Sequence, residues 1–186
     1  DSFSDGGRHL DPEAGIEAGV EMVRCGAAIL DVGGESTRPG AERVDAAIQI
    51  DRVQPVIAGL RVQPETSRTP LSIDTTRAGV AAAAITCGAA IVNDVSGGLE
   101  DPDLLGVVAD AGVGVVLMHR LRPPDRDSYS DRYTEPPVYE DVVDTVRAAL
   151  AALAARAEAA GVRSDRIAVD PGLGFGKTVQ QNLELL

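Results

Sequence analysis

The sequence contains no tryptophan, and aromatic residues make up only 3% of its 186 residues. Single-stranded nucleic acids stack on aromatic side chains, so this scarcity disfavours such a binding surface. Basic residues are also outnumbered, since 17 lysines and arginines stand against 29 aspartates and glutamates, which gives a net charge of −12 at pH 7. A chain this acidic lacks the positive surface that nucleic-acid binding needs. It must hold any anionic ligand with locally placed arginine, lysine or backbone N–H groups.

Long apolar runs and a cysteine framework are absent too. No run approaches the roughly 20 residues of a membrane span. Two cysteines, Cys25 and Cys87, make neither a disulfide framework nor a zinc pattern, and we expect both to be small buried hydrophobic residues. Hydrophobic residues still account for 44% of the chain and charged residues for 25%. We therefore treat residues 1–186 as one globular domain.

The chain is organised around five short apolar runs, each followed at once by polar residues. Continuous apolar runs are typical of parallel strands covered on both faces. The expected strands are 28–32, 70–73, 89–93, 113–118 and 166–170. Helices are expected between and around them, at 12–24, 45–60, 77–87, 101–111, 138–160 and 178–186.

Strict alternation of strand and helix predicts a parallel sheet whose polar strand ends meet at one edge. In a β/α barrel that edge is where active sites are built. A closed barrel has eight strands and about 250 residues. We therefore expect a fragment of a TIM (β/α)8 barrel covering about strands 2 to 6, without the first strand and the last two βα units. The alternative is a complete five-stranded doubly wound domain.

Two glycine-rich segments invite an anion-binding interpretation. Segment 33–40 (GGESTRPG) combines small residues with the Thr37 hydroxyl and the Arg38 guanidinium, which suits phosphate oxygens. The alternative for this segment is a mobile surface loop. Segment 172–178 (GLGFGKT) is not a P-loop, because the position that needs the first glycine is Pro171.

Asp74, Asn93 and Asp170 end three different predicted strands. Their side chains suit hydrogen bonding to a flat, nitrogen-rich ring with several donors and acceptors. The structural alternatives are helix N-capping for Asp74 and a simple turn for Asp170. His119 has no partner residues at catalytic or metal-ligand spacing, so we expect a satisfied or solvent-facing histidine.

Six segments in this order resemble dihydropteroate synthase, in an actinobacterial-like version, over the whole chain. The segments are 1–7 (DSFSDGG), 31–40 (DVGGESTRPG), 72–75 (SIDT), 92–98 (VNDVSGG), 117–119 (LMH) and 170–175 (DPGLGF). The resemblance implies a transferase of folate biosynthesis. Such an enzyme condenses 7,8-dihydropterin-6-ylmethyl diphosphate with p-aminobenzoate to give 7,8-dihydropteroate and diphosphate, with the diphosphate leaving first.

The resemblance also implies roles for individual residues. Pterin contacts are expected from Asp74, Asn93, Val95, Met118 and Asp170, and diphosphate contacts from Thr37 and Arg38. The p-aminobenzoate side, where sulfonamides would compete, is expected to involve Phe3, Asp5, Thr37, Pro39 and Phe175. Asp5, Arg38 and Asp170 are the residues expected to act directly in the reaction.

Further expectations follow from the same resemblance. Mg²⁺ is expected as the cofactor, bound by an asparagine that would precede Asp1 rather than by this chain. The parent protein is expected to be a cytoplasmic homodimer. The charged, proline-rich stretch 119–137 departs from the family pattern. Two alternatives stay open: a pterin-binding barrel that transfers a methyl group to a cobalamin partner, and a non-catalytic paralogue. Thr37 and Arg38 argue against both.

Overall fold

A computed structural model describes residues 11–186, so the expectations for Phe3 and Asp5 lie outside the described residues. The strands are β1 (Leu30–Gly33), β2 (Leu71–Asp74), β3 (Ile91–Asp94), β4 (Gly114–Met118) and β5 (Ile167–Asp170). The α-helices are α1 (Pro12–Arg24), α2 (Ala46–Val62), α3 (Ala78–Thr86), α4 (Leu104–Ala111), α5 (Val142–Ala159) and α6 (Val179–Glu184). Short 3₁₀ helices lie at Pro124–Arg126 and Ser164–Arg166.

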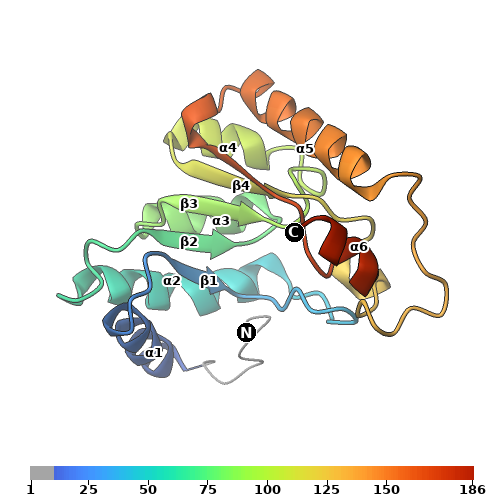
Figure 1. Ribbon diagram of the computed structural model, residues 1–186. Helices are drawn as coiled ribbons and strands as arrows, with labels where there is room; N and C mark the ends of the chain where they lie inside the picture. Colours follow the sequence, from blue (N-terminus) through green and yellow to red (C-terminus); the bar gives the residue numbers. More distant parts are fainter. Residues whose placement is uncertain (1–10) are drawn as a thin grey trace.

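The five strands form one parallel sheet in the order β1-β2-β3-β4-β5 (Figure 1). Right-handed crossovers between strands in unbroken sequential order place the connecting helices on the same face of the sheet. A doubly wound domain instead reverses its strand order and covers both faces. The structure therefore supports the predicted segment of a β/α barrel over the doubly wound alternative.

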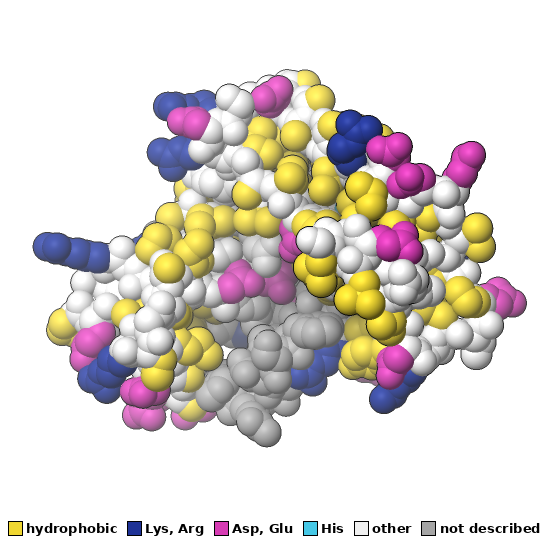
Figure 2. Space-filling view, in the orientation of Figure 1, with side chains coloured by type: hydrophobic (Ala, Val, Ile, Leu, Met, Phe, Trp, Pro, Cys, Tyr) yellow, Lys and Arg dark blue, Asp and Glu magenta, His cyan; other side chains and the backbone are white. Residues whose placement is uncertain are grey.

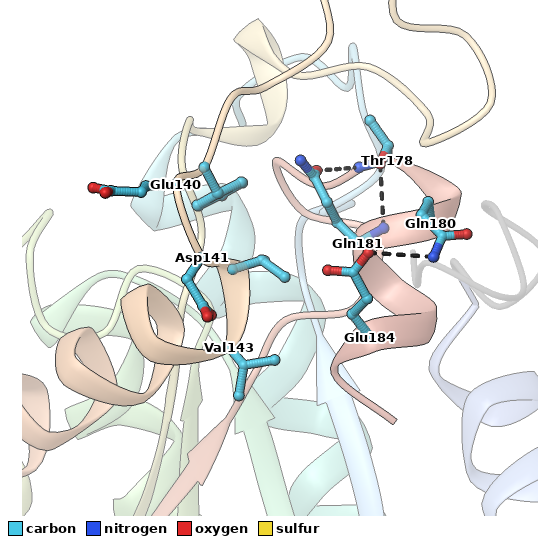
Figure 3. Close-up of a pocket in the computed structure, with 9 residues that line it drawn as sticks. Glu140, Asp141, Val143, Thr178, Gln180, Gln181 and Glu184 are labelled. Carbon is cyan, nitrogen blue, oxygen red and sulfur yellow. Dashed lines mark hydrogen bonds between the residues drawn. The ribbon is translucent and has the colours of Figure 1, made fainter.

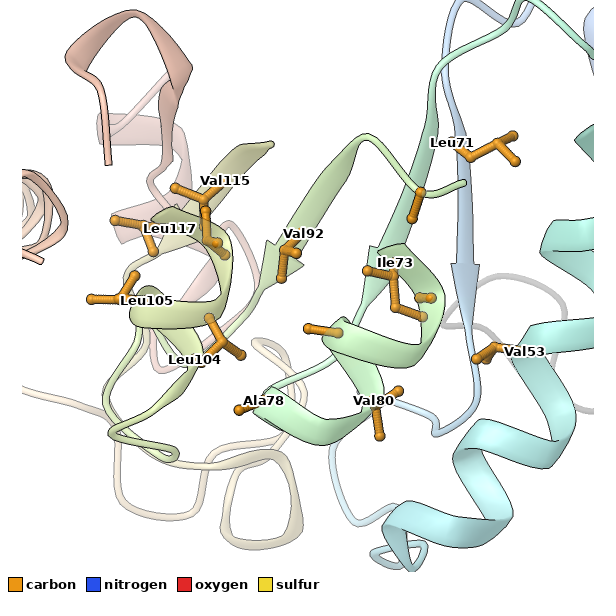
Figure 4. Close-up of a cluster of buried hydrophobic side chains, with 14 of the residues drawn as sticks. Val53, Leu71, Ile73, Ala78, Val80, Val92, Leu104, Leu105, Val115 and Leu117 are labelled. Atoms are coloured by element: carbon orange, nitrogen blue, oxygen red, sulfur yellow. The ribbon is translucent and has the colours of Figure 1, made fainter. Parts of the chain in front are cut away.

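The hydrophobic core lies between the sheet and its helices (Figure 4). Successive residues of a strand face opposite sides, so each strand sends alternate side chains into this core. Leu71 and Ile73 of β2 are fully buried, and Val92 of β3 pairs in register with Ile73. Helix α3 contributes small residues such as Ala81 and Ala84, which let it pack closely, as its alanine-rich sequence predicts. The polar residues between the core positions face the other side.

Two helices start later than predicted. Helix α4 begins at Leu104 rather than at the predicted residue 101. The Asp101 carboxylate accepts a hydrogen bond from the Ala78 amide, at the start of α3, at 2.8 Å. Helix α5 starts after Asp141, whose carboxylate accepts from the Asp144 amide at 2.8 Å. Side-chain capping by Asp141 thus fixes the start of α5 at Val142, four residues after the predicted start at 138.

The prediction for the cysteines is wrong for Cys25, which is exposed at the end of α1. Cys87 is half-buried and packs against the core. Within residues 11–186, every helix is too short or too polar to cross a bilayer.

Candidate active site

Polar side chains meet on the face of the sheet that the helices leave uncovered. Asp31 of β1 pairs in register with Ser72 of β2, and Asp74 pairs with Asn93. The Asn93 amide donates to Asp31 Oδ2 at 3.1 Å. Burial raises the pKa of Asp31, and hydrogen bonds from Ser72 and Asn93 partly offset the increase. Asp31 was not among the predicted site residues, although the two-residue strand period places it beside the others.

One carboxylate oxygen of Asp74, Oδ1, is buried and has no hydrogen-bond partner among residues 11–186. Burial raises the pKa of Asp74 well above its ordinary value, and repulsion from Asp31, Asp94 and Glu35 raises it further. The helix-capping alternative is wrong, because Arg77 occupies the N-cap position of α3. Asp74 thus carries a buried acceptor oxygen that no hydrogen bond satisfies, and the residue lines a small cavity.

Three of the predicted site residues line the same small cavity: Thr37, Asp74 and Val95. Val95 is 6% exposed, and Met118, at the end of β4, is 4% exposed. Met118 pairs in register with Asp170. The structure therefore brings these residues to one edge of the sheet. Figure 2 shows acidic side chains gathered in the central hollow of the face it displays.

The segment that carries Thr37, Arg38 and Pro39 is anchored at several points. Glu35 accepts a hydrogen bond from the Val44 amide at 2.6 Å and from the Gln49 side chain at 3.2 Å. The Gly40 amide donates to the carbonyl of Pro124 at 2.8 Å, which ties the segment to the connection after β4. Thr37, Arg38 and Pro39 are half-buried. These contacts argue against the mobile surface loop that was the alternative.

Glu100 links four of the strand-end connections. Its carboxylate accepts from Thr76 Oγ1 at 2.7 Å and forms ion pairs with Arg43 and Arg120. Arg43 also pairs with Glu35 at 3.1 Å. Burial acts to raise the pKa of Glu100, but the hydrogen bonds from Arg43 and Thr76 and the charge of Arg120 outweigh it and lower this pKa to about 2. Glu100 therefore stays ionised at every physiological pH.

Asp170 makes a hydrogen bond within a turn and also lies at the sheet edge that carries the other predicted site residues. Its Oδ1 accepts from the Gly172 amide at 2.7 Å, so the turn that was the alternative for this residue is present. Asp170 still ends β5 beside Met118, at the same edge as Asp74 and Asn93. Phe175, five residues on, is half-buried in the connection to α6. The predicted turn and the predicted site position are thus compatible.

The prediction for His119 is wrong. The side chain is only 9% exposed, and its buried Nδ1 atom has no hydrogen-bond partner within the described part of the chain, so the histidine is neither solvent-facing nor fully hydrogen-bonded. Burial lowers its pKa to about 4, and the charge of Lys177 contributes to the decrease. Lys177 itself was not predicted as a site residue. Its sequence position, within the glycine-rich segment 172–178, gave no signal that the side chain would turn inward.

A cavity of about 540 Å³ lies between the start of α5 and α6, away from these residues (Figure 3). Its lining includes Glu140, Asp141, Thr178 and Glu184. No predicted site residue takes part. Its charged lining is acidic, so it does not suit the anionic groups that segment 33–40 was predicted to hold.

The expected magnesium site was assigned to a residue outside this sequence. Among residues 11–186, no three histidine, cysteine, aspartate or glutamate side chains lie close enough to hold a metal ion together.

Comparisons with known proteins show which proteins the chain is similar to. The chain is 53% identical over 186 residues to the dihydropteroate synthase of Mycobacterium leprae, matching all of this chain and 62% of that protein. It is 40% identical to the dihydropteroate synthase of Bacillus subtilis, of which it covers 60%. The chain thus spans somewhat less than two thirds of the length of these relatives.

Solved structures give the same result. A dihydropteroate synthase of Xanthomonas albilineans with 4-aminobenzoic acid matches 98% of this chain and 61% of its own, at 41% identity and a TM-score of 0.82. A Yersinia pestis dihydropteroate synthase in a sulfonamide complex matches 100% of this chain and 63% of its own, at 34% identity and a TM-score of 0.86. The open five-stranded sheet is therefore a segment of a TIM (β/α)8 barrel. A family model described as "Pterin binding enzyme" matches residues 1–186, and the chain belongs to this family of pterin-binding enzymes.

Proposed function

We propose that the protein is a dihydropteroate synthase, condensing 7,8-dihydropterin-6-ylmethyl diphosphate with p-aminobenzoate. The observation that carries the proposal is the buried, unpartnered Oδ1 of Asp74 at an edge that also holds Asn93 and Asp170. A pterin presents ring N–H and amino donors along one side, so it would supply the hydrogen bond that Asp74 lacks. Relatives that bear this name support the same assignment.

The pterin would lie over the strand ends, with its donor edge on Asp74 and Asn93. Val95 and Met118 offer the apolar surface that a flat ring needs on its faces. Segment 33–40 lies next to this position, because Thr37 and Asp74 share a cavity. The Thr37 hydroxyl and the Arg38 guanidinium would bind the diphosphate oxygens.

In the reaction the bond between the pterin methylene carbon and the diphosphate oxygen breaks, and the diphosphate takes the electron pair. The p-aminobenzoate nitrogen then forms the new bond to the methylene carbon and releases a proton to solvent. This chemistry needs positioning and charge stabilisation more than a strong base. Arg38 would stabilise the negative charge of the leaving diphosphate. Asp5 would lie near the transient cation.

The p-aminobenzoate would bind between segment 33–40 and the connection after β5. Thr37 and Pro39 belong to the first, and Phe175 to the second, with Phe3 assigned to the same side from the resemblance. A related Xanthomonas albilineans structure contains 4-aminobenzoic acid, which supports p-aminobenzoate as a substrate. Sulfonamides would compete for the same space.

The test is an assay of diphosphate release and dihydropteroate formation by the intact protein that carries this sequence. Wild type should form the two products in equal amounts when both substrates are present. Arg38→Ala and Asp74→Ala should each lose at least about 100-fold in kcat/KM for the pterin diphosphate, since each removes a charged contact. Arg126→Ala, which removes an exposed arginine, is the matched control and should keep wild-type activity.

The other outcomes separate the alternatives. Pterin binding without turnover would favour a non-catalytic paralogue. Binding of a methylated folate, with methyl transfer to a cobalamin protein and no use of the diphosphate substrate, would favour the methyl-transfer barrel. Either result would contradict the proposal.

A further inference from the structure

Lys177 is the only lysine in the sequence; the other sixteen of the seventeen basic residues are arginines. Its side chain is fully buried, with 0% exposure. Lysines are almost never fully buried, because the ammonium group loses its hydration when it leaves water. The one lysine of this sequence therefore lies at a buried position, where the loss of hydration of a basic group costs the most free energy.

The ammonium group of Lys177 is held by three backbone carbonyl oxygens. It donates to Phe175 at 2.9 Å, to Gly172 at 3.0 Å and to His119 at 3.4 Å. An ammonium group has three N–H donors, so this arrangement uses all of them. The planar guanidinium of arginine directs its donors differently and cannot converge on three such oxygens from a single nitrogen. The geometry explains why this position carries lysine.

The three carbonyls come from two different connections. Gly172 and Phe175 lie between β5 and α6, whereas His119 directly follows β4. Lys177 therefore fastens the connection after β5 to the end of the neighbouring strand. The two segments are also in close backbone contact, because a side chain added at Gly172 would collide with the His119 carbonyl, and Gly172 has a positive φ of 67°.

Charged and polar groups from stretch 119–141 surround the same connection. Asp127 accepts from the Gly176 amide at 2.8 Å, and the Tyr139 hydroxyl donates to the Gly176 carbonyl at 2.8 Å. Burial lowers the pKa of Lys177 to about 8, and the carboxylates of Asp170 and Asp127 oppose the decrease. At neutral pH the ammonium form therefore predominates, and it retains all three donors.

We propose that Lys177 is a positioning residue that fixes Phe175 for p-aminobenzoate by holding the backbone from Gly172 to Phe175 against the end of β4. This inference rests on the proposed function, because Phe175 is assigned to the p-aminobenzoate side there. Lys177 touches no substrate. It acts through the carbonyl of Phe175 itself, whereas Asp170 is held mainly by its place in β5, in addition to its bond to the Gly172 amide.

The decisive experiment compares Lys177→Met with wild type in the intact protein. Methionine has a similar length but no donors. The KM for p-aminobenzoate should rise about tenfold, while kcat and the Kd for the pterin diphosphate stay within about twofold. Arg126→Met removes an exposed charge and serves as the matched control. Equal losses of pterin and p-aminobenzoate affinity, or no change in either, would overturn the proposal.

A double-mutant cycle tests whether the effect passes through Phe175. If it does, Lys177→Met should raise the KM of a Phe175→Ala variant by less than about twofold, whereas independent sites would show the full tenfold increase again. Lys177→Gln keeps two N–H donors and should give an intermediate KM. It replaces Lys177→Met in the cycle if the methionine variant does not fold, and an unchanged KM in a folded Lys177→Gln variant would contradict the inference.

Hydrogen exchange separates this inference from the proposed function. The amides of residues 172–176 should exchange at least about tenfold faster in Lys177→Met, while those of β2 and β3 keep wild-type rates. This readout needs no turnover. A wild-type protein that makes no dihydropteroate would therefore refute the proposed function alone, and unchanged exchange in the variant would refute the role of Lys177 alone.

Discussion

The carboxylate of Asp74 destabilises the folded protein in the absence of a ligand. It is buried, one oxygen lacks a hydrogen bond, and Asp31, Asp94 and Glu35 repel its charge. Burying a charge without a partner costs free energy, and proteins commonly accept such a cost at binding sites. Because the pKa is raised in the folded state, this cost is absent below the unfolded-state pKa, grows as pH rises from that value to the folded-state pKa, and is complete above it.

Asp74→Asn should therefore stabilise the protein and weaken pterin binding together. At neutral pH we expect the free energy of unfolding to increase, because the amide has no charge to lose its hydration or to be repelled by Asp31, Asp94 and Glu35. The Kd for the pterin diphosphate should rise at least about 100-fold. Denaturant unfolding and calorimetric titration measure the two effects. Asp110→Asn, at an exposed carboxylate on α4, is the control, and an Asp74→Asn variant less stable than wild type would contradict the account.

His119 gives a prediction for acid stability. Its pKa is lowered from 6.5 to about 4 by burial and by Lys177, so between these values the unfolded chain binds a proton that the folded protein excludes. Stability should fall as pH decreases through this range. Between about pH 7 and about pH 5 the histidine should account for a loss of about 2 kcal/mol.

Denaturant unfolding at both pH values, for wild type and for His119→Gln, measures this contribution. The glutamine variant should lose about 2 kcal/mol less than wild type on acidification, since it cannot take up the proton. Parallel losses in the two proteins would show that His119 does not keep its lowered pKa.

Residue types and strand positions predicted much of the site but not its internal contacts. Asp74, Asn93 and Asp170 lie at one edge as the strand pattern predicts, because parallel strands share a carboxyl end. The unpartnered state of Asp74 and the inward turn of Lys177 were not predictable. Both depend on which distant carbonyls and carboxylates come close in three dimensions, and a single sequence carries no record of that.

At the level of elements, the connections after the strands are cross-linked more than their sequences indicate. Glu100, after β3, contacts Thr76 after β2, Arg43 after β1 and Arg120 after β4. Isolated surface ion pairs contribute little, but a partly buried network joining separate segments can hold them in one arrangement. This network supports segment 33–40, which is assigned to the diphosphate.

Glu100→Gln should weaken the network without removing any proposed ligand contact. We expect the KM for the pterin diphosphate to rise about three- to tenfold, with kcat changed less, because the anchored segment loses one of its supports. Steady-state kinetics on the intact protein measure this split. Glu158→Gln, on the exposed side of α5, is the control. An unchanged KM in Glu100→Gln would contradict a positioning role for the network.

Element types were predictable throughout residues 11–186, while boundaries were less so. Each strand lies within two residues of its predicted start, because buried apolar runs have few other solutions. The starts of α4 and α5 were misplaced by three or four residues. In both cases an aspartate side chain decides the outcome, since Asp101 bonds to another helix and Asp141 provides the actual cap.

At the scale of the whole molecule, one face of the sheet makes the core and the other makes the site. The two-residue alternation of each strand sends Leu71 and Ile73 to the helices and Ser72 and Asp74 to the open face. In the same short strands, the side chains that face the helices stabilise the fold, and we propose that those on the open face bind the ligand. Because the net charge is −12, we propose that Thr37, Arg38 and their anchored segment are what allow the protein to accept an anionic substrate.

The central claim is that this open face is a pterin site anchored by Asp74. It is tested most directly by a crystal structure of the intact protein with the bound pterin diphosphate. We expect a ring or amino N–H of the pterin to donate to Asp74 Oδ1, with Asn93 and Asp170 within hydrogen-bond distance and the diphosphate on Thr37 and Arg38. A pterin bound elsewhere, with Asp74 Oδ1 still lacking a partner, would contradict the account.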